Sequence, residues 1–408
     1  MNSSPRSNAS DMPRIAVVGA GIVGCCIALK LRQRGAQVTL IDRGEPGGGC
    51  SHGNSGALSP SSVAPLAMPG VLASVPGMLL DAHSPLYLPP SYLPQATPWL
   101  LRFVASARPA QVARSAAALA RLHANTLARH EALAHEIGVP ELLLRRGHLH
   151  AYPDAAALAK DAAGWRLRQE HGFAFEQLDR AGIAELEPGL DARYQLGMYL
   201  ADHATILNPR RYVQAVAQAF ARAGGTLWRH AVQGLAPASG GEWQLTLDGA
   251  PPSRFDHVVV AAGAWARTLL ATVKLSVPLE SQRGYHAQFE QVQGIVSRTV
   301  VLADRKVFVT PMEDGLRVGG TVEIAGLRRA PDPRRAAVLE RIARQSFPAL
   351  GAARATHWMG HRPCMPDSVP RIGPAPQHPG LWLAVGHGHL GLTDSVNTAA
   401  LIADGLLG

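Results

Sequence analysis

The sequence predicts an α/β protein of two domains, in which the first domain is interrupted by an inserted α+β domain that carries an antiparallel sheet. Three observations lead to this prediction. Residues 14–42 follow the order strand, glycine turn, helix, strand. Another apolar strand that ends in a glycine turn lies far downstream, at residues 255–267. The chain of 408 residues is long enough for roughly two domains of about 150 to 200 residues each.

Three glycines define the first turn. The apolar run 15–18 predicts a buried parallel strand, and Gly19, Gly21 and Gly24 follow it with G-x-G-x-x-G spacing. Such glycines allow a tight turn, close approach of the backbone to a pyrophosphate, and close packing of helix on strand. The helix expected from about residue 22 to 34 directs its positive N-terminal end at the diphosphate. This stretch predicts a Rossmann-type dinucleotide site.

The residues after the turn strengthen this prediction. Asp42 ends the second strand at the spacing at which a carboxylate accepts hydrogen bonds from ribose hydroxyls. A long loop of small and polar residues, 44–60, follows directly, and its backbone can lie flat against a large planar ring. The strand and glycine turn at 255–267 would close the same nucleotide fold, which implies that a second domain is inserted between them.

Several separated motifs resemble the flavoprotein family of D-amino-acid dehydrogenases and glycine or D-amino-acid oxidases. In chain order they are VVGAGIVG with Asp42, SHGNSGALSP, VVVAAGAW, GLRVGGTVEIAG, GHRPCMPDSVPRIG and AVGHGHLGLT, and they span residues 14 to about 405. The resemblance implies FAD as cofactor and oxidation of a Cα–N bond. The loops GNSGALSP and GHGHLGLT are most similar to the bacterial D-amino-acid dehydrogenase branch. Within that branch, RGYH and MGHRPCMPDSVPRIGP resemble enzymes that act on D-hydroxyproline.

The resemblance also implies where the substrate carboxylate binds. Arg362 matches the family's carboxylate-binding arginine, and a guanidinium can bind a carboxylate through two parallel hydrogen bonds. Prolines at 363, 366 and 370 stiffen the segment around it. The alternative for Arg362 is an ion pair within the protein.

Three further substrate contacts are predicted with less support from the motifs. Phe308 stands where some related oxidases have a tyrosine that binds the carboxylate. Tyr285 either supplies the missing hydroxyl from a neighbouring strand or belongs to the core. His389 stands where related oxidases have an arginine near the substrate. Thr321 and Glu323 alternate along a strand expected to line the cavity, and their roles are unassigned.

The predicted cofactor contacts extend over the whole chain. A helix expected from about residue 394 to 406 would stabilise the anion of the reduced flavin with its N-terminal end. Non-covalent FAD is expected, because His52 and Cys364 are out of register with the attachment points of relatives that bind flavin covalently. The predicted FAD-binding residues are Gly19, Gly21, Gly24, Asp42, Arg43, Ser51, Asn54, Gly56, Val232, Gly263, Gly388, Gly391, Leu392 and Thr393.

The predicted reaction is the oxidation of a D-amino acid, with D-hydroxyproline or D-proline as candidates, by an FAD-dependent dehydrogenase. No catalytic base is predicted, because correct placement of Cα–H against the flavin supplies much of the rate. One alternative is an oxidase of glycine, sarcosine or another secondary amine that uses oxygen. Another is an RNA-modifying flavoprotein, for which the net charge of +9 would attract RNA.

Composition limits the partners. Nearly all the positive charge is arginine scattered along the chain, so no nucleic acid is expected as a partner. The four cysteines form no CxxC pair and no metal-ligand spacing, which predicts no metal site and reduced thiols in a cytoplasmic protein. The proline-rich stretch 63–103 either covers the active site or contacts the inner membrane peripherally. The expected electron acceptor is a quinone or a partner protein, the latter within an electron-transfer complex.

The predicted FAD-binding domain comprises residues 13–95, 196–275 and 353–408, and the substrate-binding domain comprises residues 96–195 and 276–352. Residues 1–12 are predicted to be a disordered leader. One long amphipathic helix is expected at 110–137, with His123, His130 and His135 solvated, and another helix at 332–347.

Overall fold

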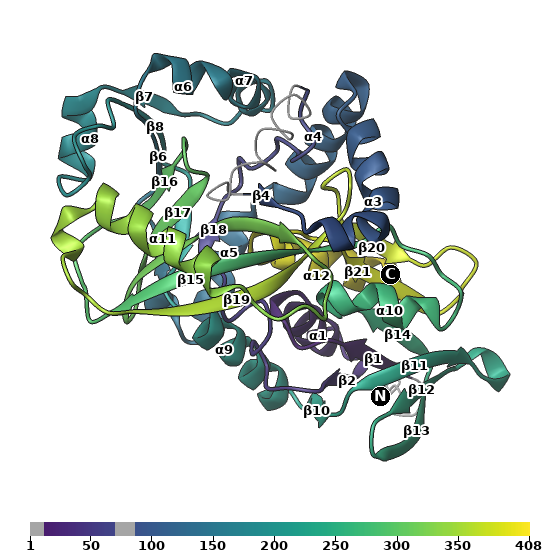
Figure 1. The fold of residues 1–408 in the computed structure, drawn as a ribbon. Helices are drawn as coiled ribbons and strands as arrows, with labels where there is room; N and C mark the ends of the chain where they lie inside the picture. The colour runs from purple at the N-terminus through teal and green to yellow at the C-terminus, as the bar shows by residue number, and fades with distance from the viewer. Residues whose placement is uncertain (1–11, 70–85) are drawn as a thin grey trace.

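The computed structural model describes residues 12–69 and 86–408, and two large β-sheets dominate it (Figure 1). The strands of the first sheet come from the N-terminal, middle and C-terminal parts of the chain. The second sheet is built mainly from the stretches between them. This arrangement confirms the predicted α/β class with an inserted domain. The predicted leader lies outside the described residues, apart from Met12.

The first sheet contains the predicted nucleotide motif. Its six strands, in pairing order, are β10 (Thr226–Arg229), β2 (Gln37–Asp42), β1 (Arg14–Val18), β14 (His257–Val260), β21 (Leu381–Val385) and β20 (Arg371–Pro374). Neighbouring strands are parallel except β20, which is antiparallel to β21. Val17 lies opposite Val259 although the two are far apart in the chain. Short apolar strands buried on both faces are typical of parallel sheets.

Helices cover one face of this sheet, and a small antiparallel sheet covers the other. The helices are α1 (Ile22–Gln33), α9 (Pro209–Arg222) and α12 (Gly391–Leu407). The small sheet consists of β11 (Val232–Pro237), β12 (Trp243–Leu247) and β13 (Ala250–Phe255), and α10 (Ala266–Ala271) lies beside it. Val17 packs among the helices, whereas Val18 packs toward the small sheet, as expected for alternating strand residues. α1 packs along α12, so the two helices lie side by side under the sheet.

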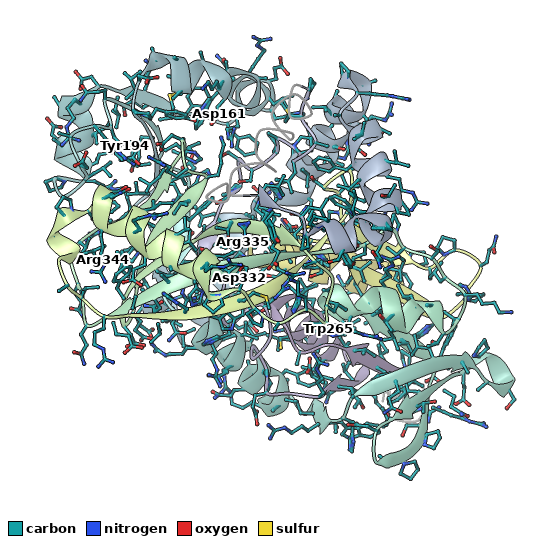
Figure 2. The ribbon with its side chains drawn as sticks, viewed as in Figure 1. Asp161, Tyr194, Trp265, Asp332, Arg335 and Arg344 are labelled. Atoms are coloured by element: carbon teal, nitrogen blue, oxygen red, sulfur yellow. The ribbon has the colours of Figure 1, made fainter. Side chains whose placement is uncertain are left out.

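The second sheet has nine strands, most of them antiparallel. In pairing order they are β19 (Ala355–Cys364), β15 (Glu280–Glu290), β18 (Gly315–Ile324), β17 (Val307–Met312), β16 (Thr299–Leu302), β6 (His148–Tyr152), β8 (Leu196–Leu200) and β7 (Glu176–Leu178), while β4 (Leu86–Tyr87) pairs with β18. α11 (Pro333–Ser346) covers one face, on which Phe289 and Leu339 pack together. Asp332 and Arg335 lie at the start of this helix (Figure 2). The helix predicted at 332–347 is therefore confirmed.

Sheet pairing differs from the predicted domain boundaries at three strands. The ranges 13–95, 196–275 and 353–408 were assigned to the FAD-binding domain, but they contain β4, β8 and β19, which pair in the second sheet. β8 is the antiparallel partner of β6, and β19 pairs with β15 over most of its length. Composition alone does not reveal which sheet an apolar strand joins.

The remaining helices and short strands are α3 (Leu93–Ser106), α4 (Pro109–His123), α5 (Thr126–Glu136), α6 (Ala155–Lys160), α7 (Ala162–Glu170), α8 (Arg180–Leu186), β3 (Ala57–Leu58), β5 (Leu143–Leu144) and β9 (Ala204–Ile206).

The predicted helix 110–137 is in fact two helices, α4 and α5. Asn125 breaks the helix with φ of +56°, a left-handed conformation that asparagine tolerates better than most residues. His123 and His130 are buried, at 1% and 0% exposure, so the prediction that they are solvated is wrong. Both lie where α4 and α5 pack on α12, while His135 is exposed as predicted.

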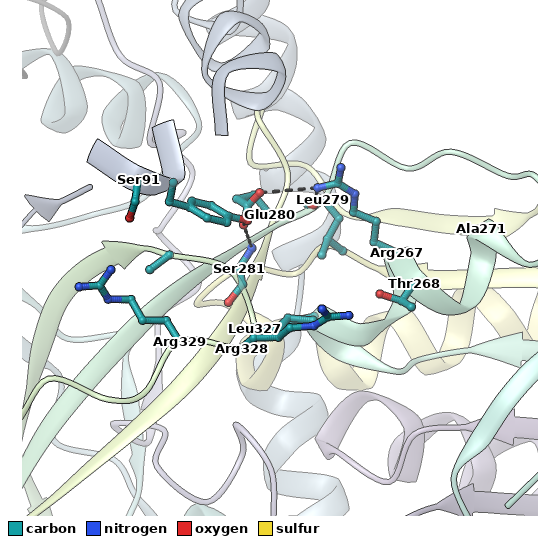
Figure 3. Close-up of a pocket in the computed structure, with 14 residues that line it drawn as sticks. Ser91, Arg267, Thr268, Ala271, Leu279, Glu280, Ser281, Leu327, Arg328 and Arg329 are labelled. Atoms are coloured by element: carbon teal, nitrogen blue, oxygen red, sulfur yellow. Dashed lines mark hydrogen bonds and ion pairs between the residues drawn. The ribbon is translucent and has the colours of Figure 1, made fainter. Parts of the chain in front are cut away.

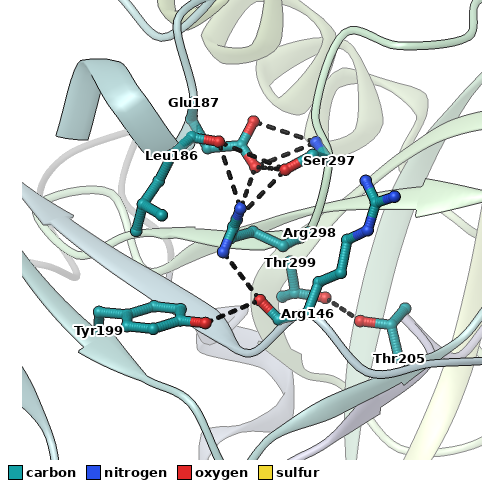
Figure 4. A network of polar contacts seen from close by, with 8 residues as sticks. All are labelled: Arg146, Leu186, Glu187, Tyr199, Thr205, Ser297, Arg298 and Thr299. Atoms are coloured by element: carbon teal, nitrogen blue, oxygen red, sulfur yellow. Dashed lines mark hydrogen bonds and ion pairs between the residues drawn. The ribbon is translucent and has the colours of Figure 1, made fainter. Parts of the chain in front are cut away.

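A buried glutamate, Glu187, follows α8 and joins it to the segments that precede β16 and β6 (Figure 4). Glu187 accepts hydrogen bonds from the main-chain N–H of Ser297 at 3.0 and 3.1 Å and from the hydroxyl of Ser297 at 2.7 Å. Arg298 Nε donates to the same carboxylate at 3.1 Å, and its Nη1 donates to the carbonyl of Arg146 at 2.9 Å. Burial raises the pKa of Glu187, and the bonds from Ser297 and Arg298 oppose that rise.

Candidate functional site

The glycine motif forms the turn between β1 and α1. Gly19 has φ of +111°, and a Cβ there would lie 2.4 Å from the carbonyl oxygen of Ala261, just after β14. A Cβ on Gly24 would lie 1.8 Å from the carbonyl oxygen of Gly19. A Cβ on Gly21 would meet no atom closer than 3.5 Å. Glycine at 19 and 24 is therefore required by packing within the protein, whereas Gly21 leaves the backbone open, which suits the close approach of a diphosphate.

Asp42 and Ser51 organise the rim of this turn. The carboxylate of Asp42 accepts hydrogen bonds from the N–H of Ala20 at 2.7 Å and of Gly44 at 2.8 Å. Ser51 Oγ accepts from the N–H of Ile22 at 3.1 Å. The first turn of α1 itself holds no acidic residue. Because each carboxylate oxygen can accept a second hydrogen bond, these residues fit a diphosphate with a neighbouring ribose.

The loop 51–56 is fixed on the second sheet by two side chains that sequence reasoning missed. Arg317 Nη1 donates to the carbonyls of His52 at 3.0 Å and of Asn54 at 2.6 Å, and burial lowers the pKa of Arg317 to about 10. His286 Nδ1 lies 3.1 Å from the carbonyl of Gly53, and burial lowers the pKa of His286 to about 3. The predicted flavin loop is thus attached to the face of the second sheet opposite α11.

Gly56 shows why this loop is rich in small residues. It has φ of +72°, and a Cβ there would lie 2.2 Å from the carbonyl oxygen of Ile206. Its N–H donates to the side-chain oxygen of Asn54 at 2.7 Å. Both predicted residues therefore shape the loop.

Buried side chains hold the N-terminal turn of α12. His130 Nε2 lies 2.9 Å from the carbonyl of Leu392, and burial lowers the pKa of His130 to about 4. Thr393 Oγ1 accepts from the N–H of Ser59 at 3.1 Å. His123 Nε2 lies 3.0 Å from Asp394 Oδ1. The predicted residues Leu392 and Thr393 are buried, so their side chains anchor this helix end.

Arg362 extends from β19 across β15 to β18. Its Nη1 donates to the carbonyl of Thr321 at 2.9 Å, and its Nη2 donates to the carbonyl of Gly320 at 3.4 Å. Within residues 12–69 and 86–408 it forms no ion pair with a carboxylate, which disfavours the alternative of a structural ion pair. Burial lowers its pKa, but a guanidinium keeps its charge in a protein. A buried charge without an acidic partner is costly, so an anion bound beside Arg362 would stabilise it.

Loop 386–390 and Cys50 complete the surroundings of Arg362. Gly388 donates its N–H to the carbonyl of Pro363 at 2.8 Å, which ties the loop to β19. The side chain of His389 is accessible and lines a small pocket together with Cys364 and Leu390. Burial, with help from the charge of Arg362, lowers the pKa of His389 to about 4. Burial raises the pKa of the Cys50 thiol, and Arg362 opposes that rise. Arg362 therefore lies near enough to His389 and to Cys50 for its charge to act on the pKa of each.

The structure separates the two aromatic residues predicted to contact substrate. Phe308 lies opposite Gly319 in the β17–β18 pair, on the same face as His286 and Arg362. Tyr285 points to the other face, toward α11, where its hydroxyl donates to Glu323 Oε2 at 2.5 Å.

The contacts of Tyr285 are those of the core alternative. Its hydroxyl also accepts from the N–H of Asp332 at 3.0 Å, and burial raises the pKa of Tyr285 to about 12. Glu323 lies 3.5 Å from Arg283 Nη1, and both side chains are fully buried. Glu323 therefore belongs to this buried cluster behind the sheet rather than to the cavity.

The remaining predicted cofactor residues lie at the carboxyl end of the first sheet. Gly263 follows β14 with φ of +54°, and a Cβ there would meet nothing within 4 Å. Arg43 follows β2 and stacks on Trp265, with its Cζ 4.4 Å from the ring centre. Val232 packs against the hydrophobic cluster beside β2, and Gly391 lies near α1. Ligands of parallel α/β sheets bind at this end.

A separate cleft of about 640 Å³ lies between α10 and the loop after β18 (Figure 3). Its buried carboxylate, Glu280, accepts from Tyr92 Oη at 3.1 Å and from the N–H of Ser281 at 3.0 Å. Arg267 extends toward it, 3.6 Å away. None of the predicted site residues lines this cleft.

Comparison with known proteins identifies the family. The model of the family described as DAO, FAD dependent oxidoreductase, matches residues 14–405. The chain belongs to this family. FAD is accordingly its cofactor. The open backbone at Gly21 and the carboxylate of Asp42 are compatible with such a ligand.

Curated relatives agree with this assignment. The chain is 40% identical over 401 residues to a D-amino-acid oxidase of Bradyrhizobium diazoefficiens, covering 97% of this chain and 95% of that protein. It is 36% identical over 422 residues to D-amino acid dehydrogenase 2 of Ralstonia nicotianae, covering 96% of both. The fold is that of glycine oxidase from Geobacillus kaustophilus, with a TM-score of 0.75 at 22% identity over 97% of this chain and 95% of that one.

Sequence reasoning missed the side chains that only support the site. Arg317 and His286 hold loop 51–56, and the charge of Arg362 acts on Cys50. A signal was present for Arg317, since an arginine between apolar residues in GLRVGG is unusual in a buried strand. Cys50 and His286 gave no such signal, because nothing local marks which face of a loop or strand meets the cavity.

Proposed function

We propose that this FAD-dependent oxidoreductase oxidises the Cα–N bond of a D-amino acid, with D-hydroxyproline or D-proline as candidate substrates. The observation that carries the proposal is Arg362, an enclosed guanidinium without a carboxylate partner among the described residues. Two of its five N–H donors are occupied by main-chain carbonyls, so donors remain for a substrate carboxylate. Relatives named D-amino-acid oxidase and D-amino acid dehydrogenase support this substrate class.

Arg362 would fix the substrate by its carboxylate and so determine which Cα–H is presented. FAD, when bound by the glycine turn between β1 and α1 and by loop 51–56, would supply the acceptor for the hydride that leaves Cα. His389, which lines a small pocket beside Cys364, and Phe308, which lies on the same face of the second sheet as Arg362, would contact the substrate side chain. The substrate amine must be neutral to form the imine product, and His389, whose pKa is lowered to about 4, adds no positive charge that would compete for the carboxylate at neutral pH. No side chain is assigned as a catalytic base.

The visible spectrum of the purified protein under anaerobic conditions tests this function. Titration with D-amino acids, cis-4-hydroxy-D-proline, glycine and sarcosine should bleach the flavin band with a D-amino acid and not with its L-form. Bleaching by glycine or sarcosine alone would favour the oxidase alternative. A yellow protein that none of these compounds bleaches would contradict the proposal and leave the RNA-modifying alternative.

The electron acceptor is proposed to be a quinone or a partner protein. An exposed apolar surface on α3 supports contact with a membrane that contains quinone: Leu101 is 65% exposed, Leu93 and Val104 are also exposed, and Arg102 lies among them. Apolar side chains beside a cation suit an anionic lipid surface. No helix in the described parts of the chain is long and apolar enough to cross a membrane.

Sedimentation of the holoenzyme with anionic vesicles tests the membrane contact, and Leu101→Ser should reduce the bound fraction. Reoxidation rates of the reduced enzyme with oxygen and with a soluble quinone, measured side by side, would separate an oxidase from a dehydrogenase.

A further inference from the structure

The backbone of β18 is irregular where it meets Arg362. Arg283 pairs with Glu323 and Tyr285 pairs with Gly320, so Thr321 and Val322 together face Gly284. This two-against-one pairing is a β-bulge, a feature that often lies next to active sites. Thr321 has φ of +58°, which is unusual for a β-branched residue.

The bulge explains how two successive carbonyls reach one guanidinium. Successive carbonyls of a regular strand point in opposite directions within the sheet. The left-handed conformation of Thr321 breaks that alternation, and the carbonyls of Gly320 and Thr321 both accept from Arg362. The hydroxyl of Thr321 is buried and makes no hydrogen bond within the described residues. The contact that this strained residue makes with Arg362 is therefore through its main chain.

Gly284 occupies the other side of the guanidinium. A Cβ at 284 would lie 2.1 Å from Arg362 Cζ, 2.2 Å from Nη2 and 2.4 Å from Nη1. All three nearest atoms belong to the guanidinium, so any side chain at 284 would displace the planar group itself. Gly284 faces Gly360 across β15 and β19, and neither residue has a side chain to fill the space.

We propose that Gly284 and Thr321 are positioning residues that set the plane of Arg362 for the substrate carboxylate. Gly284 lets the guanidinium lie against β15, and the Thr321 bulge fixes one edge of it with two carbonyls, so that the remaining N–H donors keep one direction. The inference rests on the proposed role of Arg362. It extends that role to two residues that do not themselves contact the substrate.

A double-mutant cycle on the holoenzyme tests the inference. Gly284→Ala should raise KM, and the dissociation constant of acetate read from the visible flavin spectrum, by about 10- to 100-fold, the loss expected when a charge-assisted hydrogen-bond pair is misplaced. In the Arg362→Lys background, which lacks the planar group, adding Gly284→Ala should have little further effect. Gly234→Ala is the matched control, because its new Cβ would lie 3.8 Å from the nearest atom.

Each result of the cycle is decisive. Equal effects of Gly284→Ala in both backgrounds would mean that Gly284 does not act through Arg362, and the inference would be overturned. If Gly284→Ala alone does not retain flavin, the double variant should regain it, because lysine leaves room for the methyl group; a double variant that also fails overturns the inference. If Arg362→Lys leaves acetate binding unchanged, the proposed role of Arg362 itself fails.

Discussion

The cofactor cradle and the wall around Arg362 differ in how the chain builds them. The cradle is nearly continuous in sequence: β1, its glycine turn, α1 and β2 lie within residues 14–42. The wall combines Gly284, Thr321 and Arg362 from three strands, together with a loop from residues 386–390. The comparison shows that a glycine turn between strand and helix can be encoded locally, whereas the surroundings of Arg362, the proposed substrate site, depend on sheet pairing.

The largest effect is expected on FAD binding, when a side chain is added to the glycine turn. Gly24→Ala would place a Cβ 1.8 Å from the carbonyl oxygen of Gly19, and overpacking of this severity costs at least about 3 kcal/mol, on the order of 100-fold in FAD affinity. The ratio of flavin to protein absorbance after purification measures this loss. Gly234→Ala is the control, since a Cβ there would lie 3.8 Å from the nearest atom and outside the nucleotide turn. Full flavin content in Gly24→Ala would show that the turn is not the cradle.

The contact between Arg317 of the second sheet and loop 51–56 should be nearly as sensitive to substitution. Arg317→Met would leave the carbonyls of His52 and Asn54 without their buried donor, at a cost of about 3 kcal/mol in the free energy of unfolding. Urea denaturation of the holoenzyme measures it. Arg254→Met on the exposed edge of β13 is the control and should change stability little. An unchanged unfolding midpoint in Arg317→Met would mean that the loop is held by other contacts.

Acid should destabilise the packing around two buried histidines, His130 in α5 and His148 in β6. Burial lowers the pKa of His130 and of His148 to about 4 each, whereas an unfolded histidine titrates near 6.5. Below pH 6.5 the unfolded chain binds protons that the folded chain does not, so stability falls between pH 6.5 and 4. At pH 5 the loss is about 2 kcal/mol per histidine.

Urea unfolding of the holoenzyme at pH 7.5, 6 and 5 measures this acid loss, and His130→Gln should reduce its slope. His135→Gln, at an exposed position, serves as the comparison and should leave the slope unchanged. Equal slopes in wild type and His130→Gln would contradict the prediction.

The smallest effect on catalysis is expected at Tyr285. Its hydroxyl faces α11 and bonds to Glu323 and Asp332, so Tyr285→Phe should lower the free energy of unfolding by about 1 to 3 kcal/mol. KM should change by less than about twofold, because the hydroxyl lies on the face opposite Arg362. A large rise in KM with unchanged stability would place Tyr285 in the substrate wall after all.

The sequence predicted correctly those features that depend on contacts between residues close together in the chain. The spacing of Gly19, Gly21, Gly24 and Asp42 predicts the cradle, because each of these residues acts on neighbours within one turn or one strand. The resemblance of separated motifs indicated FAD chemistry and Arg362. The break at Asn125 was missed, because α4 and α5 share one apolar pattern that continues across it.

Tertiary structure alone decided the rest. The strand sequence RGYH does not show that Gly284 faces Arg362 while Tyr285 faces α11, because only the pairing of β15 with β19 and β18 sets which side meets the cavity. The same holds for β8 and β19, whose sheet is chosen by partners distant in the chain. A strand's alternation determines that its residues take opposite faces, but long-range packing determines which face becomes the site.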